Sequence, residues 1–275
     1  MNDSIMQFGN WADRIIGAGE TSFDGFAKIA DVFDEAVSTG AYVASLHDLV
    51  GRMASGATDI TPNVSSGPFV VLYSSRVTTW AILLHRNINA GLYLNPTHSI
   101  SAPVAGHSVD SVLYETDRKV DFSVLDPATR LVQKQVKLHQ TAEHLLKDGR
   151  SQALDVQPTG FGPAFTLRAN SAAFGAFEWS FDRNTRLPKR VTSISNVHSN
   201  IESIFDLLAA VGSSSSVDVV EPFLTHGAHH VRWKAVQTVG RLAPERRRTM
   251  VRNALNDRHP HIRQAAAATL EQLPQ

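Results

Sequence analysis

Apolar residues recur at helical intervals in the first part of the chain. Within residues 22–54 they form two separate faces, one of Phe26, Ile29, Phe33 and Val37 and the other of Tyr42, Leu46, Leu49, Val50 and Met53. Gly40 lies between the two runs, and this spacing is typical of amphipathic helices. We therefore expect two helices here, which cover one end of a sheet or mediate a dimer.

Between about residues 68 and 195 the pattern changes to short segments rich in Val, Ile, Thr, Phe and Leu, separated by Gly, Pro, Asn and Asp. The predicted strands are 69–73, 78–84, 90–94, 111–114, 120–125, 131–138, 164–167 and 174–181. Many short strands without long helices between them favour an antiparallel sandwich or barrel over a parallel sheet. Residues 140–147 are expected to form a single helical turn within this region.

The pattern changes again after residue 191, and helical spacing extends from residue 200 to residue 211. A run of Gly212 followed by four serines comes next, and such a run is typical of a flexible connection. We place a domain boundary near residue 196. The expected fold class is α+β, in which residues 1–195 form the N-terminal helices and a β domain and residues 196–275 form a helical domain.

Two segments of the helical region align without gaps at an offset of 31 residues, and self-similarity at this period is typical of solenoid repeats. The segments are 231–242 and 262–273, and a His-rich turn precedes each of them. The turns contain His229 and His230 in the first copy and His259 and His261 in the second. With an arginine after each turn and a small residue at each packing position, the pattern resembles the HEAT repeat family over about residues 217–275.

The HEAT resemblance implies a stack of helical hairpins in which Arg232 and Arg263 pair with an acidic residue of a neighbouring repeat. It also implies an interaction surface more than a catalytic site. Two readable copies are fewer than the roughly three repeats that a solenoid needs to be stable alone. We therefore expect this region to dock on the β domain or to associate with another subunit.

Composition sets limits on the class of protein. The 275 residues are 43% hydrophobic and 19% charged, which is ordinary for a globular protein. The absence of cysteine excludes disulfides and thiolate ligands, and it fits a reducing compartment. The chain opens without a signal-peptide pattern, and its apolar runs are far shorter than the roughly 20 residues that span a bilayer. We therefore expect a cytoplasmic protein without a membrane-spanning segment.

Charge is distributed unevenly although the formal net charge is zero. Residues 222–275 contain nine Lys and Arg against three Asp and Glu, so this tail carries +6 and the remainder −6. Arg246, Arg247, Arg248 and Arg252 concentrate the positive charge on one predicted helix. They are candidate contacts for an acidic protein, or for nucleic acid, which is less favoured because no aromatic residues lie among them. The alternatives are a solvated helix face and contact with the chain's own acidic domain.

Residues 96–115, PTHSISAPVAGHSVDSVLYE, resemble the first half of a cupin motif. If Pro103 matches the proline of that family, His107 takes the place of the second metal-binding histidine, Ala105 replaces the first, and Glu115 lies beyond the place of the glutamate. The second motif is echoed by residues 158–163, where Pro163 replaces the histidine. The resemblance covers about residues 68–185 and implies a cupin-like barrel whose standard metal set is broken.

Four histidines of the β region are candidate ligands of a divalent transition metal in a rearranged set: His98, His107, His139 and His144. Imidazole suits zinc, iron, copper and nickel, so the residue type fits this chemistry. The alternative is that all four are ordinary strand or surface residues, since spacing alone does not show whether they converge.

Without a metal, a barrel of this size binds a small molecule in its mouth, where Arg86, Tyr93, His107 and Glu115 are candidates to orient it. His107, His139 and Glu115 are the candidate catalytic acid–base residues. Two hypotheses remain open. One is a cupin-like small-molecule-binding protein, with an enzyme as its stronger form. The other is a non-enzymatic adaptor whose basic tail binds an acidic protein or nucleic acid.

Overall fold

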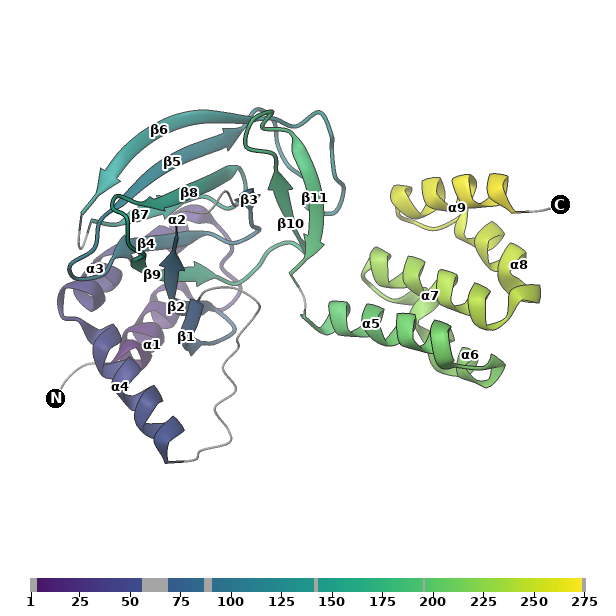
Figure 1. Ribbon diagram of the computed structural model, residues 1–275, viewed down its shortest axis with the longest axis horizontal. Coiled ribbons are helices and arrows are strands. Elements are labelled where there is room, and N and C mark those ends of the chain that lie inside the picture. Colours follow the sequence, from purple (N-terminus) through teal and green to yellow (C-terminus); the bar gives the residue numbers. More distant parts are fainter. Residues whose placement is uncertain (1–3, 56–68, 87–90, 141–142, 195, 274–275) are drawn as a thin grey trace. The chain divides into compact units, whose positions relative to one another are not determined.

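The computed structural model describes residues 4–55, 69–86, 91–140, 143–194 and 196–273 (Figure 1). The chain forms two compact units, residues 1–192 and residues 193–275. Each unit has apolar cores of its own.

Helices open the first unit: α1 (Ile5–Ile16), α2 (Phe23–Ala27), α3 (Ala30–Ser38) and α4 (Ala41–Ala54). The prediction of two helices within residues 22–54 missed a break, because a turn at Lys28 and Ile29 separates α2 from α3. The predicted apolar face is confirmed, since Phe26, Ile29, Phe33 and Val37 are all buried.

Helix α1 was not predicted, although its sequence carries the usual signals. Ser4 and Gln7 form a capping box at its start, and buried residues recur every three or four positions from Ile5 to Ile16. The signal was therefore present before residue 22.

The described strands are β1 (Phe69–Ser74), β2 (Thr78–His85), β3 (Leu92–Leu94), β4 (Ser99–Pro103), β5 (Val109–Thr116), β6 (Leu131–His139), β7 (Leu145–Lys147), β8 (Gln152–Pro158), β9 (Ala164–Ser171), β10 (Phe177–Phe181) and β11 (Pro188–Ser193). Strands β4, β7, β8 and β11 were not predicted. Residues 120–125 form no strand, because Phe122 packs its ring from a loop onto Trp179. The helical turn expected at 140–147 is wrong in its described part: Leu145–Lys147 pairs with β4 as a strand, and residues 141 and 142 lie outside the described chain.

The strands form two layers. One is a five-stranded sheet of order β1-β2-β9-β4-β7, and the other consists of β11-β10-β3 and β6-β5-β8, with β3 lying beside β8. Consecutive strands cross between the layers along β2-β3-β4-β5 and β6-β7-β8-β9, an arrangement typical of jelly rolls. The α+β class and the antiparallel sheets are confirmed. The described strands do not close into a barrel.

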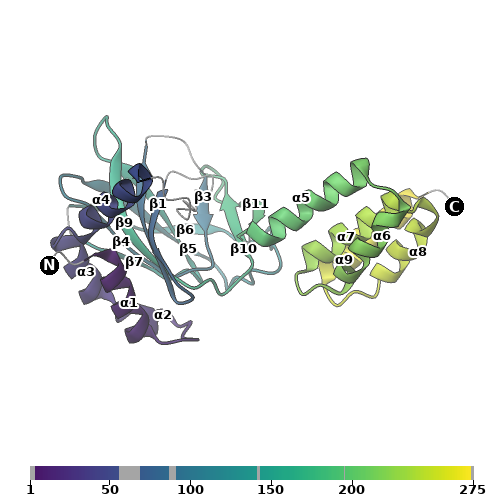
Figure 2. The same ribbon diagram turned by 90° about the horizontal axis from the view of Figure 1, so that it is seen from below.

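The five-stranded sheet has two chemically different faces. One face packs on the N-terminal helices (Figure 2), where Trp80, Ile100 and Leu167 are fully buried and the ring of Phe33 lies 5.5 Å from that of Trp80. The other face is directed at the second layer. It carries the alternate residues of the same strands, because successive side chains of a strand point to opposite faces.

The second unit is helical. It contains α5 (Asn196–Val211), η1 (Ser214–Ser216), α6 (Val217–Val220), η2 (Glu221–Thr225), α7 (His229–Leu242), α8 (Pro244–Ala254) and α9 (Pro260–Gln272). Ala235 and Ala266, at matching places in the two similar segments, are both fully buried. Arg232 at the start of α7 donates two hydrogen bonds to Asp257, at 2.9 and 2.7 Å. In the described parts of both units, every helix is too short or too polar to cross a bilayer.

Candidate functional site

Two of the predicted histidines are directed at the N-terminal helices. His98 is fully buried, its Nε2 lies 3.0 Å from the carbonyl oxygen of Thr21, and its Nδ1 lies 3.1 Å from a carboxylate oxygen of Asp148. The Nδ1 of His144 lies 2.7 Å from a carboxylate oxygen of Asp34 in α3. These contacts connect the helices to the sheet.

The predicted catalytic residues His107, His139 and Glu115 lie in the second layer, near the two ends of β5. His107 precedes β5, and His139, the last residue of β6, pairs with Val109 next to it. Glu115 lies at the far end of β5, more than about 20 Å away by strand length, and pairs with Lys134 at 3.2 Å. Burial lowers the pKa of His139, with a smaller contribution from Lys137. The structure therefore brings His107 near His139 but not near Glu115.

Within the described chain the four histidines do not form a group that could hold one ion, although His144 lies close enough to His139 to contribute to its lowered pKa. A cupin-type metal therefore does not fit this donor set. A metal-binding role for any single one of these histidines stays a prediction.

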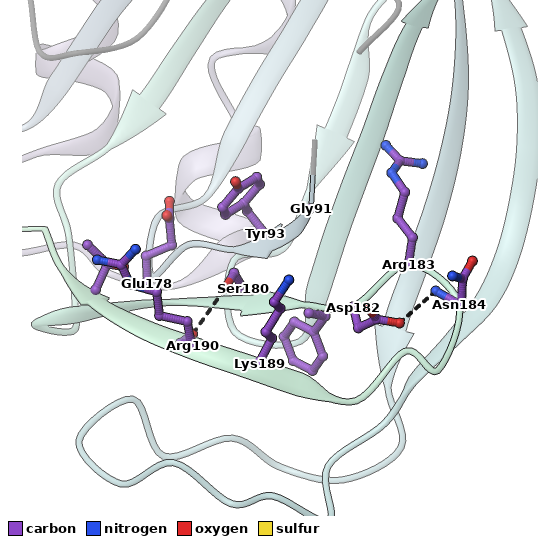
Figure 3. A pocket seen from close by; sticks show the side chains of 11 residues that line it. Gly91, Tyr93, Glu178, Ser180, Asp182, Arg183, Asn184, Lys189 and Arg190 are labelled. Atoms are coloured by element: carbon purple, nitrogen blue, oxygen red, sulfur yellow. Dashed lines mark hydrogen bonds between the residues drawn. The ribbon is translucent and has the colours of Figure 1, made fainter. Parts of the chain in front are cut away.

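Of the four residues predicted to orient a small molecule, His107 and Glu115 are described above, and Arg86 is exposed directly after β2. Tyr93 in β3 lines a pocket of about 580 Å³ (Figure 3). Charged residues of both signs line the same pocket: Glu178, Asp182, Arg183, Lys189 and Arg190. Tyr93 is therefore placed among charged groups, whereas Arg86 is not part of this pocket.

The inner face of the five-stranded sheet is polar. Cross-strand register places its residues in rows, the first being Thr79, Asn170, Ser99 and Lys147 and the second Ala81, Arg168, Ser101 and Leu145. These positions alternate with the apolar residues that pack on the helices. Strands two apart in a sheet are separated by about 9.5 Å, so the long side chains of Lys147 and Arg168 reach the same space between the layers.

Two cations lie on this inner face, Lys147 buried and Arg168 half-buried. Lys147 is 6% exposed, and its pKa is lowered to about 7, chiefly by burial and secondarily by the charge of Arg168, while Asp148 and Glu178 oppose the shift. Burial lowers the pKa of Arg168 to about 10. The Nε of Arg168 is buried and has no hydrogen-bond partner among the described residues. Burying a cation without a paired anion is costly.

Two further titratable groups lie beside these cations. Burial raises the pKa of the Glu178 carboxyl, with Lys147 opposing the shift, and Glu178 also lines the pocket of Figure 3. The Nε2 of His85 lies 2.9 Å from the hydroxyl of Thr166. The pKa of His85 is lowered to about 4, chiefly by burial and then by Arg168. An uncharged imidazole from β2 and a carboxyl from β10 that ionises less readily than usual therefore lie beside the two cations.

A buried ion pair in the second layer fixes one edge of the pocket. Arg183 donates from both terminal nitrogens to the Asp155 carboxylate, at 2.6 and 2.7 Å. This bidentate geometry is the strong form of the interaction. Arg183 is thereby held at the pocket rim with its charge balanced, in contrast to Lys147 and Arg168.

Sequence reasoning missed Lys147, Arg168 and Glu178. The sequence signal for Arg168 was the strict alternation of apolar and polar residues in β9, where Phe165, Leu167 and Ala169 alternate with polar residues. Alternation of this kind normally indicates a solvent-facing polar side. Only the pairing of both layers shows that this polar side is covered.

The arginines predicted to bind a partner lie on α8 of the second unit. Arg246, Arg247, Arg248 and Arg252 are all exposed, and Arg246 pairs with Glu221. Their role in binding a partner stays a prediction.

No family model matches the chain, and no curated protein matches it. Among solved structures, a hydroquinone 1,2-dioxygenase in complex with Cd²⁺ and 4-hydroxybenzonitrile is similar at a TM-score of 0.30 and 12% identity, over 42% of this chain and 69% of that one. A DMSP lyase from Ruegeria pomeroyi gives 0.30 and 10%, over 50% and 67%. An uncharacterized protein with a double-stranded β-helix domain from Klebsiella pneumoniae gives 0.29 and 7%, over 48% and 91%. TM-scores at this level establish neither a shared fold nor a shared activity.

Proposed function

We propose that the β domain is a cupin-like jelly roll that binds a small anionic molecule between its two layers. Its strands alternate between layers as in jelly rolls, the class to which cupins belong. Lys147 and Arg168 are the proposed anion-binding residues. The single observation that carries the proposal is the pair of cations on one face of a sheet, with Lys147 buried, Arg168 half-buried, and the buried Arg168 Nε lacking an acceptor among the described residues.

A bound anion would balance the positive charge of Lys147 and Arg168 and would accept a hydrogen bond from the Arg168 Nε. A carboxylate or phosphate accepts bidentate hydrogen bonds from guanidinium, and an ammonium adds a compact positive charge. Charge-assisted hydrogen bonds in a site shielded from water are stronger than those at a surface. Serine hydroxyls of the same face, such as those of Ser99 and Ser101, are candidate neutral donors to the anion.

The stronger form of this proposal is an enzyme with a metal-free acid–base site. Sites of this kind hold titratable groups whose pKa values the surroundings push away from their ordinary values. Glu178 and His85 have this property beside the proposed anion site. Glu178 is the better placed to act on a ligand, because it also lines the pocket that contains Tyr93.

Titration calorimetry with acetate, malonate and inorganic phosphate at pH 6.5 tests the binding proposal. We expect at least one of these anions to bind, and Lys147→Met and Arg168→Met each to weaken that binding by about tenfold or more. Lys134→Met is the matched control, because Lys134 pairs with Glu115 on an exposed surface. Equal affinity in the wild type and both inner-face variants would contradict the proposal.

For the second unit we propose a HEAT-type interaction domain. The 31-residue similarity, the buried Ala235 and Ala266 and the Arg232–Asp257 pair support it. The exposed arginines of α8 are the proposed contacts for an acidic protein. Binding to such a partner should weaken with added salt and should be lost on replacing Arg247, Arg248 and Arg252 together.

A further inference from the structure

Three histidines of the second unit come together, although 30 residues separate His229 from His259. His229 begins α7, His259 is the N-cap of α9, and His261 lies in the first turn of α9. One potential ligand atom from each lies within 4.8 Å of those of the other two, and this is the sole such group in the described part of the chain. The two His-rich turns of the repeated segments therefore meet at one place.

The local backbone holds these turns in position. The Asp257 carboxylate accepts a hydrogen bond from the His259 backbone nitrogen at 2.7 Å and pairs with Arg232 of the other helix. The His259 Nδ1 accepts a hydrogen bond from the backbone nitrogen of His261 at 3.3 Å, so a neutral ring carries its proton on Nε2, and binding a metal through either nitrogen requires His259 to give up this bond. Because Arg232 is paired with Asp257, its charge is balanced beside the cluster.

We propose that His229, His259 and His261 bind one divalent transition-metal ion of the Zn²⁺ type, with a water molecule as the fourth ligand. Three imidazoles with one open position form a common zinc coordination set. Partial burial of all three side chains limits competition by water.

Metal binding requires a small movement of the side chains. The rings of His229 and His259 stack at 3.5 Å with 2° between their planes, and two parallel rings cannot both direct a lone pair at one ion. A zinc–nitrogen distance of about 2.0–2.1 Å requires ligand atoms roughly 3.4 Å apart in a tetrahedral site. Rotation of one ring out of the stack brings the three nitrogens from within 4.8 Å to that spacing. The bound ion would then join α7 to α9 and stabilise the helical unit.

Zn²⁺ titration of the chelator-treated full-length protein, with elemental analysis after desalting, tests the site. We expect one equivalent of Zn²⁺ to bind, and His261→Ala and the double variant His229→Ala/His261→Ala each to lower the affinity by about 100-fold or more. His261 is preferred for the single variant, because His259 also caps a helix. His230→Ala, which lies beside the group but outside it, is the matched control and should bind as the wild type does.

Substitution of Co²⁺ for Zn²⁺ gives a second readout that does not depend on stability. The wild type should show the visible absorption of a tetrahedral cobalt site, and the double variant should not. Stoichiometric tight binding that survives in the double variant would overturn the proposal, as would loss of the metal in His107→Ala alone, which would place the ion in the β domain. Anion binding by the β domain is measured separately, so failure of either proposal leaves the other intact.

Discussion

The two faces of the five-stranded sheet are built from the same strands and have opposite chemistry. One buries Trp80, Ile100 and Leu167 under the helices, whereas the other presents Lys147 and Arg168 to the second layer. The apolar face accounts for stability. The polar face is destabilising as it stands, because buried charge without a partner opposes folding. Natural proteins keep such features chiefly where function needs them, which is why the polar face is the proposed site.

The largest expected effect comes from breaking the apolar face. Trp80→Ala should lower the free energy of unfolding by about 3–5 kcal/mol, because a fully buried indole leaves a large cavity. Urea denaturation followed by circular dichroism measures this. Leu83→Ala, on the inner face of the same strand and only partly buried, is the comparison and should cost clearly less. Similar losses for both would show that the two faces do not differ as described.

Removing a buried cation should change the free energy of unfolding in the opposite direction. Lys147→Met should raise the free energy of unfolding by about 1–3 kcal/mol, because methionine fills similar space without a charge to desolvate. The same denaturation experiment measures the change in the absence of added anions, with Lys134→Met as control. A loss of more than about 1 kcal/mol in Lys147→Met would mean that Lys147 makes a stabilising interaction and is part of the structure.

Acid should destabilise the inner face through His85. Its pKa is about 4 in the folded protein, below the ordinary value near 6.5, so the unfolded chain binds a proton that the folded protein does not bind between these values. This contribution to stability is present above about pH 6.5 and is lost as the pH falls to about 4. The His85→Gln variant should therefore lose less stability than the wild type between pH 6.5 and 4.5, on the order of 1–2 kcal/mol less. Parallel pH dependences for the two proteins would argue against a buried neutral His85.

Alkali should produce a smaller change through Lys147. Its pKa of about 7 in the folded protein lies below the ordinary value of 10.5, so the folded state releases its proton first as the pH rises. The wild type should gain stability between pH 7 and 9, and its difference from Lys147→Met should shrink over that range. A constant difference would show that Lys147 keeps its proton.

Hydrophobic spacing predicted the helical face of Phe26 to Val37 and most of the long strands. It failed where tertiary pairing decides the structure. The segment at Leu145–Lys147 is too short to show a period, and it becomes a strand because β4 has an open edge beside it. The site was harder to predict. Histidines are the obvious candidate site residues in the sequence, yet His98 and His144 contact the N-terminal helices. The cations of the inner face are Lys147 and Arg168, and sequence spacing alone predicts that both lie on a solvent-exposed face.

For the His-rich turns, the sequence pattern was visible but the contact between the turns could not be predicted from it. Their recurrence at the start of each similar segment was visible in the sequence, but nothing in the spacing indicated that His229 would stack on His259. That contact depends on the packing of α7 against α9, which a local pattern does not encode.

The central claim is that buried cations of the inner face bind an anion, and its most direct test is the pH dependence of that binding. Affinity for the anion identified by calorimetry should fall by about tenfold between pH 6.5 and 8.5 in the wild type, as Lys147 loses its charge. In Lys147→Arg, which stays charged, the affinity should remain nearly constant over the same range. Affinity in the wild type that does not change with pH would contradict the account.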